Sequence, residues 1–193
     1  MDANTKKQIT EIVKSHKKML AKFEAQGIET IAAAAGVITK VLKQNRRIYI
    51  CGNGGSAADA QHIAGEFVGR FTRERKGLPA VALTTDTSVI TSIANDYGYE
   101  NAFARQVEAL VQKGDILWAI STSGSSPNIL AAAKLAKKKG ARILAFTGVK
   151  NSKLEKTADI CFCAHDKSAA RSQEIHQIAY HIICDLVEQK FCS

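Results

Sequence analysis

The chain has 193 residues, 46% of them hydrophobic, which suits one globular domain with a full apolar core. Its formal charge of +9 comes from two segments, residues 1–50 and 134–156, which together carry +13, so the remaining residues sum to −4. Aromatic residues are few and are not interleaved with these charges, so we expect solvated helix faces and no nucleic-acid partner.

The sequence also argues against membrane and secreted classes. No apolar run is long enough to cross a bilayer, and the first residues do not resemble a signal peptide. Five cysteines occur without a C-x-x-C pair, which favours reduced thiols. Cys161 and Cys163 share one face of a predicted strand, and we interpret them as core because small thiols commonly fill apolar interiors. We therefore expect a cytoplasmic protein with no membrane partner.

Two helices are predicted at the start of the chain, at residues 3–26 and 28–44, separated at Gly27. The first carries apolar side chains spaced for one helix face: Ile9, Ile12, Val13, Leu20 and Phe23.

Beyond residue 45, short apolar runs typical of buried parallel strands alternate with helical patterns. The runs lie at residues 47–51, 80–83, 115–120, 142–147 and 159–163. The helical patterns lie at residues 56–70, 86–111, 126–139 and 169–190. Pro127 and Gly140 mark the ends of the third. This alternation predicts an α/β fold, a three-layer αβα sandwich around a five-stranded parallel sheet, preceded by the two helices.

Two turns rich in small residues, CGNGGS at residues 51–56 and STSGSS at residues 121–126, each join a predicted strand to a predicted helix. Backbone N–H groups at a helix N-terminus bind anions. Ligands of such folds collect at the carboxyl ends of the strands, where both turns would lie. The second turn offers hydroxyl groups and no lysine, which favours a small phosphorylated metabolite.

The first turn also fits the dinucleotide-binding pattern G-x-G-x-x-A through Gly52, Gly54 and Ala57. That pattern needs an acidic residue about 20 positions further on. Asp86 lies 29 residues beyond Ala57, and the second turn has no role in a dinucleotide site. We therefore favour the phosphorylated metabolite.

Two further groups are candidates for chemistry. His62 and Glu66 are four residues apart, so their side chains share one face of the helix that starts at the first turn. By spacing alone they are also compatible with an ordinary surface pair. In the last helix, Ile175, Ile178, Ile182 and Leu186 define a predicted buried stripe. His181 lies beside that stripe, where a structural core or interface histidine is the ordinary interpretation.

In combination these motifs resemble the phosphoheptose isomerases of the sugar isomerase (SIS) domain class. The resemblance rests on the first turn, the His62/Glu66 pair, AND at 94–96, ISTSG at 120–124 and QEIH at 173–176 followed by His181. It spans nearly the whole chain and implies a flavodoxin-like SIS domain over residues 1–193, with residues 1–45 serving oligomerisation and residues 46–193 forming the sugar-phosphate-binding core. It also implies a homotetramer with sites at subunit contacts.

The activity that the resemblance implies is conversion of sedoheptulose 7-phosphate to D-glycero-D-manno-heptose 7-phosphate, the first step toward heptose for bacterial surface glycans. It implies a zinc ion held by His62, Glu66, Gln173 and His181. The implied substrate-binding residues are Asn53, Gly54, Gly55, Glu66, Asn95, Asp96, Ser121, Thr122, Ser123, Ser126 and Gln173. Some relatives have Asp where this chain has Ala170.

Moving a proton between C1 and C2 of an open-chain ketose requires a base at carbon, a proton donor near oxygen and stabilisation of the enediolate. We assign Glu66 as the base and His181 as the proton shuttle between the two oxygens.

Helix geometry adds a separate expectation. Gln173 and His181 are eight residues apart, about 12 Å along one helix, whereas a zinc ion contacts its ligands at about 2 Å. We therefore expect a neighbouring subunit to supply at least one of these two ligands.

Two other functions are considered. One is a non-catalytic SIS protein that binds the replication initiator, which the presence of Glu66 and His181 disfavours. The other is an SIS isomerase of another sugar phosphate, which the paired leading helices and the QEIH run disfavour.

Overall fold

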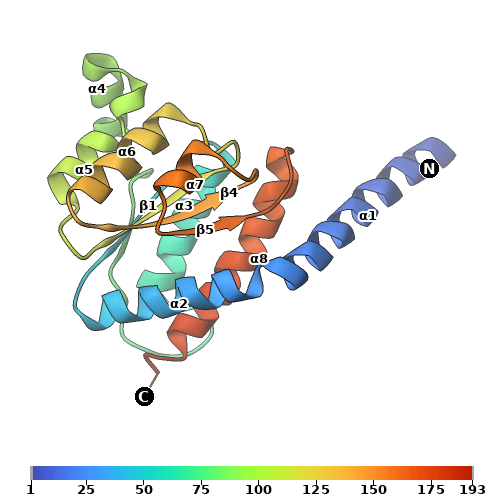
Figure 1. The fold of residues 1–193 in the computed structure, drawn as a ribbon, viewed down its shortest axis with the longest axis horizontal. Coiled ribbons are helices and arrows are strands. Elements are labelled where there is room, and N and C mark those ends of the chain that lie inside the picture. Colours follow the sequence, from blue (N-terminus) through green and yellow to red (C-terminus); the bar gives the residue numbers. More distant parts are fainter. Residues whose placement is uncertain (1, 193) are drawn as a thin grey trace.

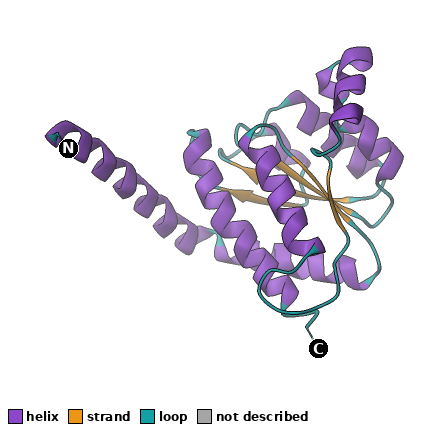
Figure 2. Ribbon diagram, turned by 180° about the vertical axis from the view of Figure 1, so that it is seen from behind, coloured by secondary structure: helices purple, strands orange, loops and turns teal. Residues whose placement is uncertain are grey.

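The protein is a parallel sheet covered by helices on both faces, in a computed structural model that describes residues 2–192 (Figures 1 and 2). The strands are β1 (Ile48–Cys51), β2 (Ala80–Ala82), β3 (Ile116–Ser121), β4 (Arg142–Thr147) and β5 (Ile160–Cys163). The longer helices are α1 (Ala3–Gln26), α2 (Ile28–Lys43), α3 (Gly55–Val68), α4 (Thr87–Tyr97), α6 (Pro127–Lys138) and α8 (Ala169–Glu188). The shorter ones are η1 (Tyr99–Asn101), α5 (Ala104–Leu110) and α7 (Lys153–Thr157). The predicted α/β class and the five-stranded parallel sheet are confirmed.

The strand order is β2-β1-β3-β4-β5, and every pairing is parallel. The chain moves outward from β1 to β2 in one direction and from β3 to β5 in the other. This order places β1 beside β3, with Cys51 opposite Ala119. The loops that follow β1 and β3 therefore leave the sheet at its switch point, where ligands of such folds bind.

Two apolar cores hold the layers together. One lies between the sheet and α2, α3 and α8, and includes the fully buried Ile38, Ile63 and Ile183. The other lies between the opposite sheet face and α5, α6 and α7, and includes Leu117 and Ile129. Because α3 and α8 pack on the same face of the sheet, their facing side chains come together.

The prediction of one continuous helix over residues 86–111 is wrong. The chain forms α4, η1 and α5 instead. The break lies at Gly98, whose φ of +84° is in the left-handed region that glycine adopts without a Cβ penalty. A short helix that the sequence interpretation missed, α7, is capped by Ser152, whose hydroxyl accepts a hydrogen bond from the Glu155 N–H at 3.2 Å.

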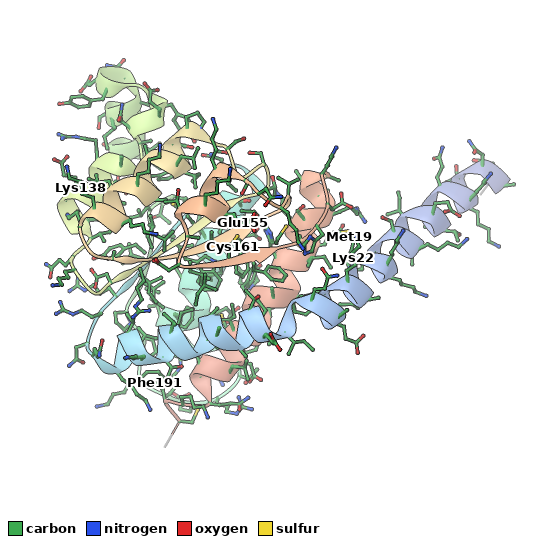
Figure 3. The ribbon with its side chains drawn as sticks, viewed as in Figure 1. Met19, Lys22, Lys138, Glu155, Cys161 and Phe191 are labelled. Atoms are coloured by element: carbon green, nitrogen blue, oxygen red, sulfur yellow. The ribbon has the colours of Figure 1, made fainter. Side chains whose placement is uncertain are left out.

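Helix α1 projects from the rest of the molecule (Figure 1), and the side chains of its N-terminal part stand clear of the body in Figure 3. Met19 is the single buried residue along α1. The predicted apolar face is largely exposed in one chain, at 50% for Ile9 and 52% for Ile12. On α8, the predicted buried stripe is only partly confirmed, because Ile175 is buried whereas Ile182 is 37% exposed.

The two strand cysteines are less buried than a core interpretation requires. Cys161 packs against the second core, but Cys161 and Cys163 are both half-buried. Both line a cavity of about 190 Å³ at the β5 edge of the sheet, together with Lys22 and Glu155; Figure 3 labels Glu155 beside Cys161.

Within residues 2–192, no single helix is long and apolar enough to span a bilayer. Helices α1 and α2 meet that requirement only when taken together, and they are bent by 66° at the break between them.

Candidate functional site

Paired amides join the loop after β1 to the start of α6, the helix that follows the loop after β3. Asn53 Nδ2 donates to Asn128 Oδ1 at 2.9 Å, and Asn128 Nδ2 donates back to Asn53 Oδ1 at 2.8 Å. The Tyr99 hydroxyl also donates to Asn53 Oδ1, at 2.9 Å. These contacts bring together segments that are 75 residues apart, so the two predicted anion-binding turns form one surface.

Hydroxyl groups gather at the end of β3. Ser121 Oγ lies 3.0 Å from Ser126 Oγ and 3.4 Å from Ser123 Oγ. Across the switch point, Gly54 has a φ of +56°, and the backbone there turns directly into α3. Serine hydroxyls on one side and the N-terminus of α3 on the other are suitable donors for a phosphate group.

A second cluster joins α3 to α8. His62 Nε2 lies 2.9 Å from Glu66 Oε1 and 3.4 Å from His181 Nε2. One ligand-capable atom of each of the three lies within 4.8 Å of the others. The spacing of His62 and Glu66 was visible in the sequence, whereas the packing of α8 on α3 brings in His181.

The surroundings of His181 favour a neutral imidazole. Burial lowers the pKa of His181 below its ordinary value, and the neighbouring His62 lowers it further. A neutral imidazole offers one nitrogen that donates and one that accepts a proton. Glu66, with its side chain 21% exposed, faces both imidazoles.

Two imidazole nitrogens and a carboxylate oxygen are a ligand set that zinc accepts. Their convergence to within 4.8 Å matches a shared ion, so these residues fit a divalent metal.

The fourth predicted ligand does not lie with these three in one chain. The Gln173 amide packs against Gly55 at the start of α3, where a Cβ on Gly55 would be 2.5 Å from Gln173 Nε2. Gly55 and His62 are seven residues apart, roughly 10 Å along α3. Gln173 therefore lies beside the first of the two predicted anion-binding turns, and its role as a metal ligand stays a prediction.

Asn95 and Asp96 lie on α4, and both are exposed. Asn95 Nδ2 donates to Asp96 Oδ1 at 2.8 Å. Among the described residues, no hydrogen bond joins either side chain to the two turns. Their role in substrate binding also stays a prediction.

Four side chains that the sequence interpretation missed touch the site, namely Asp59, Tyr99, Asn128 and Tyr180. Asp59 precedes His62 by three residues on the same helix face, a spacing that could have revealed it. Tyr180 is buried and directly precedes His181. Burial raises the pKa of Asp59 to about 6, although the Tyr180 hydrogen bond and His62 oppose that rise. Burial and Asp59 raise the pKa of Tyr180, which keeps its hydroxyl protonated.

A buried ion pair lies next to the cluster of His62, Glu66 and His181 and contacts its backbone. Arg75 Nε lies 3.3 Å from Glu188 Oε1, and both side chains are 1% exposed. Glu188 also accepts hydrogen bonds from the backbone N–H groups of residues 71–73. Arg75 Nη2 donates to the Glu66 carbonyl at 2.7 Å. This pair ties the segment after α3 to α8, and it holds Phe71 with its ring 5.5 Å from that of His181.

Comparison with known proteins identifies the family. Residues 12–148 match the family model described as the SIS domain. The chain is 47% identical over 188 residues to a phosphoheptose isomerase of Roseiflexus sp. (strain RS-1), covering 97% of this chain and 95% of that protein. It is 51% identical over 166 residues to one of Thermodesulfovibrio yellowstonii, covering 86% and 83%.

Solved structures agree. The phosphoheptose isomerase of Neisseria gonorrhoeae superposes with a TM-score of 0.91 at 36% identity, covering 96% of this chain and 99% of that one. That of Francisella tularensis gives 0.92 at 34% identity, covering 96% and 98%. By sequence and by fold, the chain belongs to the phosphoheptose isomerases of the SIS domain family, and it is an aldose–ketose isomerase.

Proposed function

We propose that this protein converts D-sedoheptulose 7-phosphate to D-glycero-D-manno-heptose 7-phosphate, the first step in making heptose for bacterial surface glycans. The observation that carries the proposal is the pairing of an anion-binding surface at the β1/β3 switch point with an acid–base cluster on α3 and α8. Relatives that match over most of their length and are called phosphoheptose isomerases support the choice of substrate.

The phosphate is bound by the two turns. Hydroxyl groups surround the phosphate oxygens, namely those of Ser121, Thr122, Ser123 and Ser126. The hydroxyls of Ser123 and Ser126 already lie within 3.4 Å of Ser121 Oγ. Gly54 and Gly55 present the N-terminus of α3, and the amide of Asn53 is held for hydrogen bonding by Asn128. Asn95, Asp96 and Gln173 contact the sugar. Binding of the phosphate by the two turns needs no metal ion, because hydroxyl and backbone N–H groups suffice as hydrogen-bond donors to a phosphate.

The isomerisation proceeds through an enediolate. Glu66 removes the proton from C1 of the ketose and returns it at the neighbouring carbon, and His181 moves the proton between O1 and O2. Positioned acid and base groups are typically worth about 10²- to 10⁴-fold each in rate. A zinc ion held by His62, Glu66, His181 and Gln173 supplies Lewis acidity toward the substrate oxygens when bound.

The active assembly is a homotetramer in the cytoplasm, with sites at subunit contacts. Two observations support shared sites. Gln173 lies roughly 10 Å along the helix direction from the cluster of His62, Glu66 and His181 in its own chain, so we assign the Gln173 ligand to a neighbour. Residues 1–45 assemble the subunits, because the apolar face of α1 is exposed in a single chain. The free cysteines suit a reducing compartment.

The test is direct measurement of heptose 7-phosphate formed from sedoheptulose 7-phosphate, with the zinc content of each preparation determined. We expect turnover by the wild type, and loss of at least 10²-fold in Glu66→Gln and His181→Gln. Glu74→Gln is the matched control, because the Glu74 side chain is 88% exposed and its turnover should match the wild type. If the zinc-replete wild type turned over only five- or six-carbon ketose phosphates, the heptose assignment would be wrong.

A further inference from the structure

The two nitrogens of His62 face different surroundings. Nε2 points into the cluster, 2.9 Å from Glu66 Oε1 and 3.4 Å from His181 Nε2. Nδ1 faces the opposite way and lies 3.1 Å from the hydroxyl of Tyr180. One nitrogen is therefore available to an ion while the other is engaged by a buried phenol.

Tyr180 is held firmly in this position. Its side chain is 1% exposed, and its ring packs edge-on against His62 at 5.5 Å and against His181 at 4.8 Å between centroids. Its hydroxyl also lies 3.4 Å from Asp59 Oδ1. The three side chains form a chain of polar contacts from the Asp59 carboxylate, through Tyr180, to the imidazole of His62.

Asp59 has few alternative partners. Among the described residues, its second oxygen, Oδ2, is buried without a hydrogen-bond partner. Asp59, His62 and Glu66 recur at intervals of three and four residues, so they occupy one face of α3. Because this half-buried carboxylate relies on one donor, the direction in which that donor's hydroxyl points matters.

The proton positions along the chain depend on what Nε2 contacts. When Nε2 offers its lone pair to a cation, the imidazole proton must be on Nδ1, which then donates to Tyr180. The single hydrogen of the phenol is thereby directed to Asp59. When Nε2 instead donates to Glu66, Nδ1 becomes an acceptor, and the phenol hydrogen turns from Asp59 to His62. Only the first arrangement gives the Asp59 carboxylate a donor.

We propose that Asp59 and Tyr180 are positioning residues that hold His62 in the tautomer and orientation suited to a divalent cation bound at His62, Glu66 and His181. The inference rests on the metal site of the proposed function and adds two residues to it. Outer hydrogen-bond partners of a metal-bound histidine typically change metal affinity by about 10- to 100-fold.

The experiment measures the dissociation constant for Zn²⁺ by chelator competition with the full chain. Wild type is compared with Tyr180→Phe and Asp59→Asn. The matched control is Tyr49→Phe, because Tyr49 is also buried and its hydroxyl donates to the Leu110 carbonyl at 3.0 Å, on the opposite face of the sheet. We expect the dissociation constant to rise about 10- to 100-fold in the first two variants and less than twofold in Tyr49→Phe.

A second readout is the visible absorption of the Co²⁺-loaded protein, which reports the ligand geometry. We expect it to change in Tyr180→Phe and Asp59→Asn and to stay as in the wild type in Tyr49→Phe. Should Tyr180→Phe fail to fold, Asp59→Asn carries the test, because it leaves the buried ring in place.

Zinc affinities of Tyr180→Phe and Asp59→Asn within twofold of the wild type would overturn the inference. An equal loss in Tyr49→Phe would overturn it as well, since any missing buried hydroxyl would then have the same effect. The proposed substrate is tested separately. If the zinc affinities of the variants changed as expected but the zinc-replete wild type did not isomerise sedoheptulose 7-phosphate, the inference would stand and the proposed substrate would be refuted.

Discussion

The buried carboxylate of Glu188 should be a principal source of stability in this fold. Its side chain is 1% exposed, is paired with the equally buried Arg75, and accepts backbone N–H groups of residues 71–73. Burial alone would raise its pKa, but the hydrogen bonds from Thr72, Phe71 and Arg73 outweigh burial and lower it from 4.5 to about 2. The folded state therefore strongly favours the ionised form.

We predict that Glu188→Gln destabilises the protein by about 3 kcal/mol at pH 7. A pKa lowered by roughly two and a half units corresponds to about this free energy. It also lies at the lower end of the ~3–5 kcal/mol lost when one partner of a buried ion pair is removed. For a chain of this length, the midpoint of thermal unfolding should fall by about 6–12 °C.

The assay is equilibrium or thermal unfolding at one fixed protein concentration, because assembly would also shift the midpoint. Glu108→Gln is the control. The Glu108 side chain is 57% exposed and lies 2.7 Å from Arg105, so its loss should cost less than about 1 kcal/mol.

Acidity gives a second check on the same reasoning. Because the folded pKa of Glu188 lies below the unfolded value, its contribution is fully present above about pH 4.5 and disappears as the pH falls toward 2. The gap in stability between wild type and Glu188→Gln should therefore close over this range. A Glu188→Gln variant within 1 kcal/mol of the wild type at pH 7, or a gap that did not depend on pH, would refute the reasoning.

Two more predictions concern the site and its support. Gly55→Ala should lower kcat/KM without lowering the unfolding midpoint, because a Cβ there would displace only the flexible Gln173 amide, 2.5 Å away, and alanine suits a helix; unchanged kinetics would show that the position of Gln173 is unimportant. His176 is fully buried, its Nε2 lies 3.0 Å from the Thr147 carbonyl, and burial lowers its pKa to about 4. The unfolded chain then binds the extra proton, so the wild type should lose up to about 3 kcal/mol of stability as the pH falls from 6.5 to 4. The slope of unfolding free energy against pH should be shallower in His176→Gln, and equal slopes would contradict this assignment.

Local patterns sufficed for much of the fold. The apolar runs of the five strands, the break at Gly27 and the bounds near Pro127 and Gly140 all depend on neighbours within a few residues, and the structure has them close to the predicted positions. The capping pattern Ser152-x-x-Glu155 was also readable and marks α7. The break at Gly98 was not predicted, because an apolar helical pattern runs through it and only the left-handed backbone reveals the end of α4.

The site divides in the same way. The two turns predicted to bind an anion and the shared helix face of His62 and Glu66 could be inferred from local sequence, because they follow from strand-to-helix junctions and from the helical repeat. The folded chain was needed to show that His181 joins that pair, that Tyr180 links His62 to Asp59, and that Gln173 lies beside Gly55. The two residues of each such contact are separated by more than 100 positions in the chain. They meet because α3 and α8 bury their apolar faces on the same side of the sheet, a packing that no local spacing encodes.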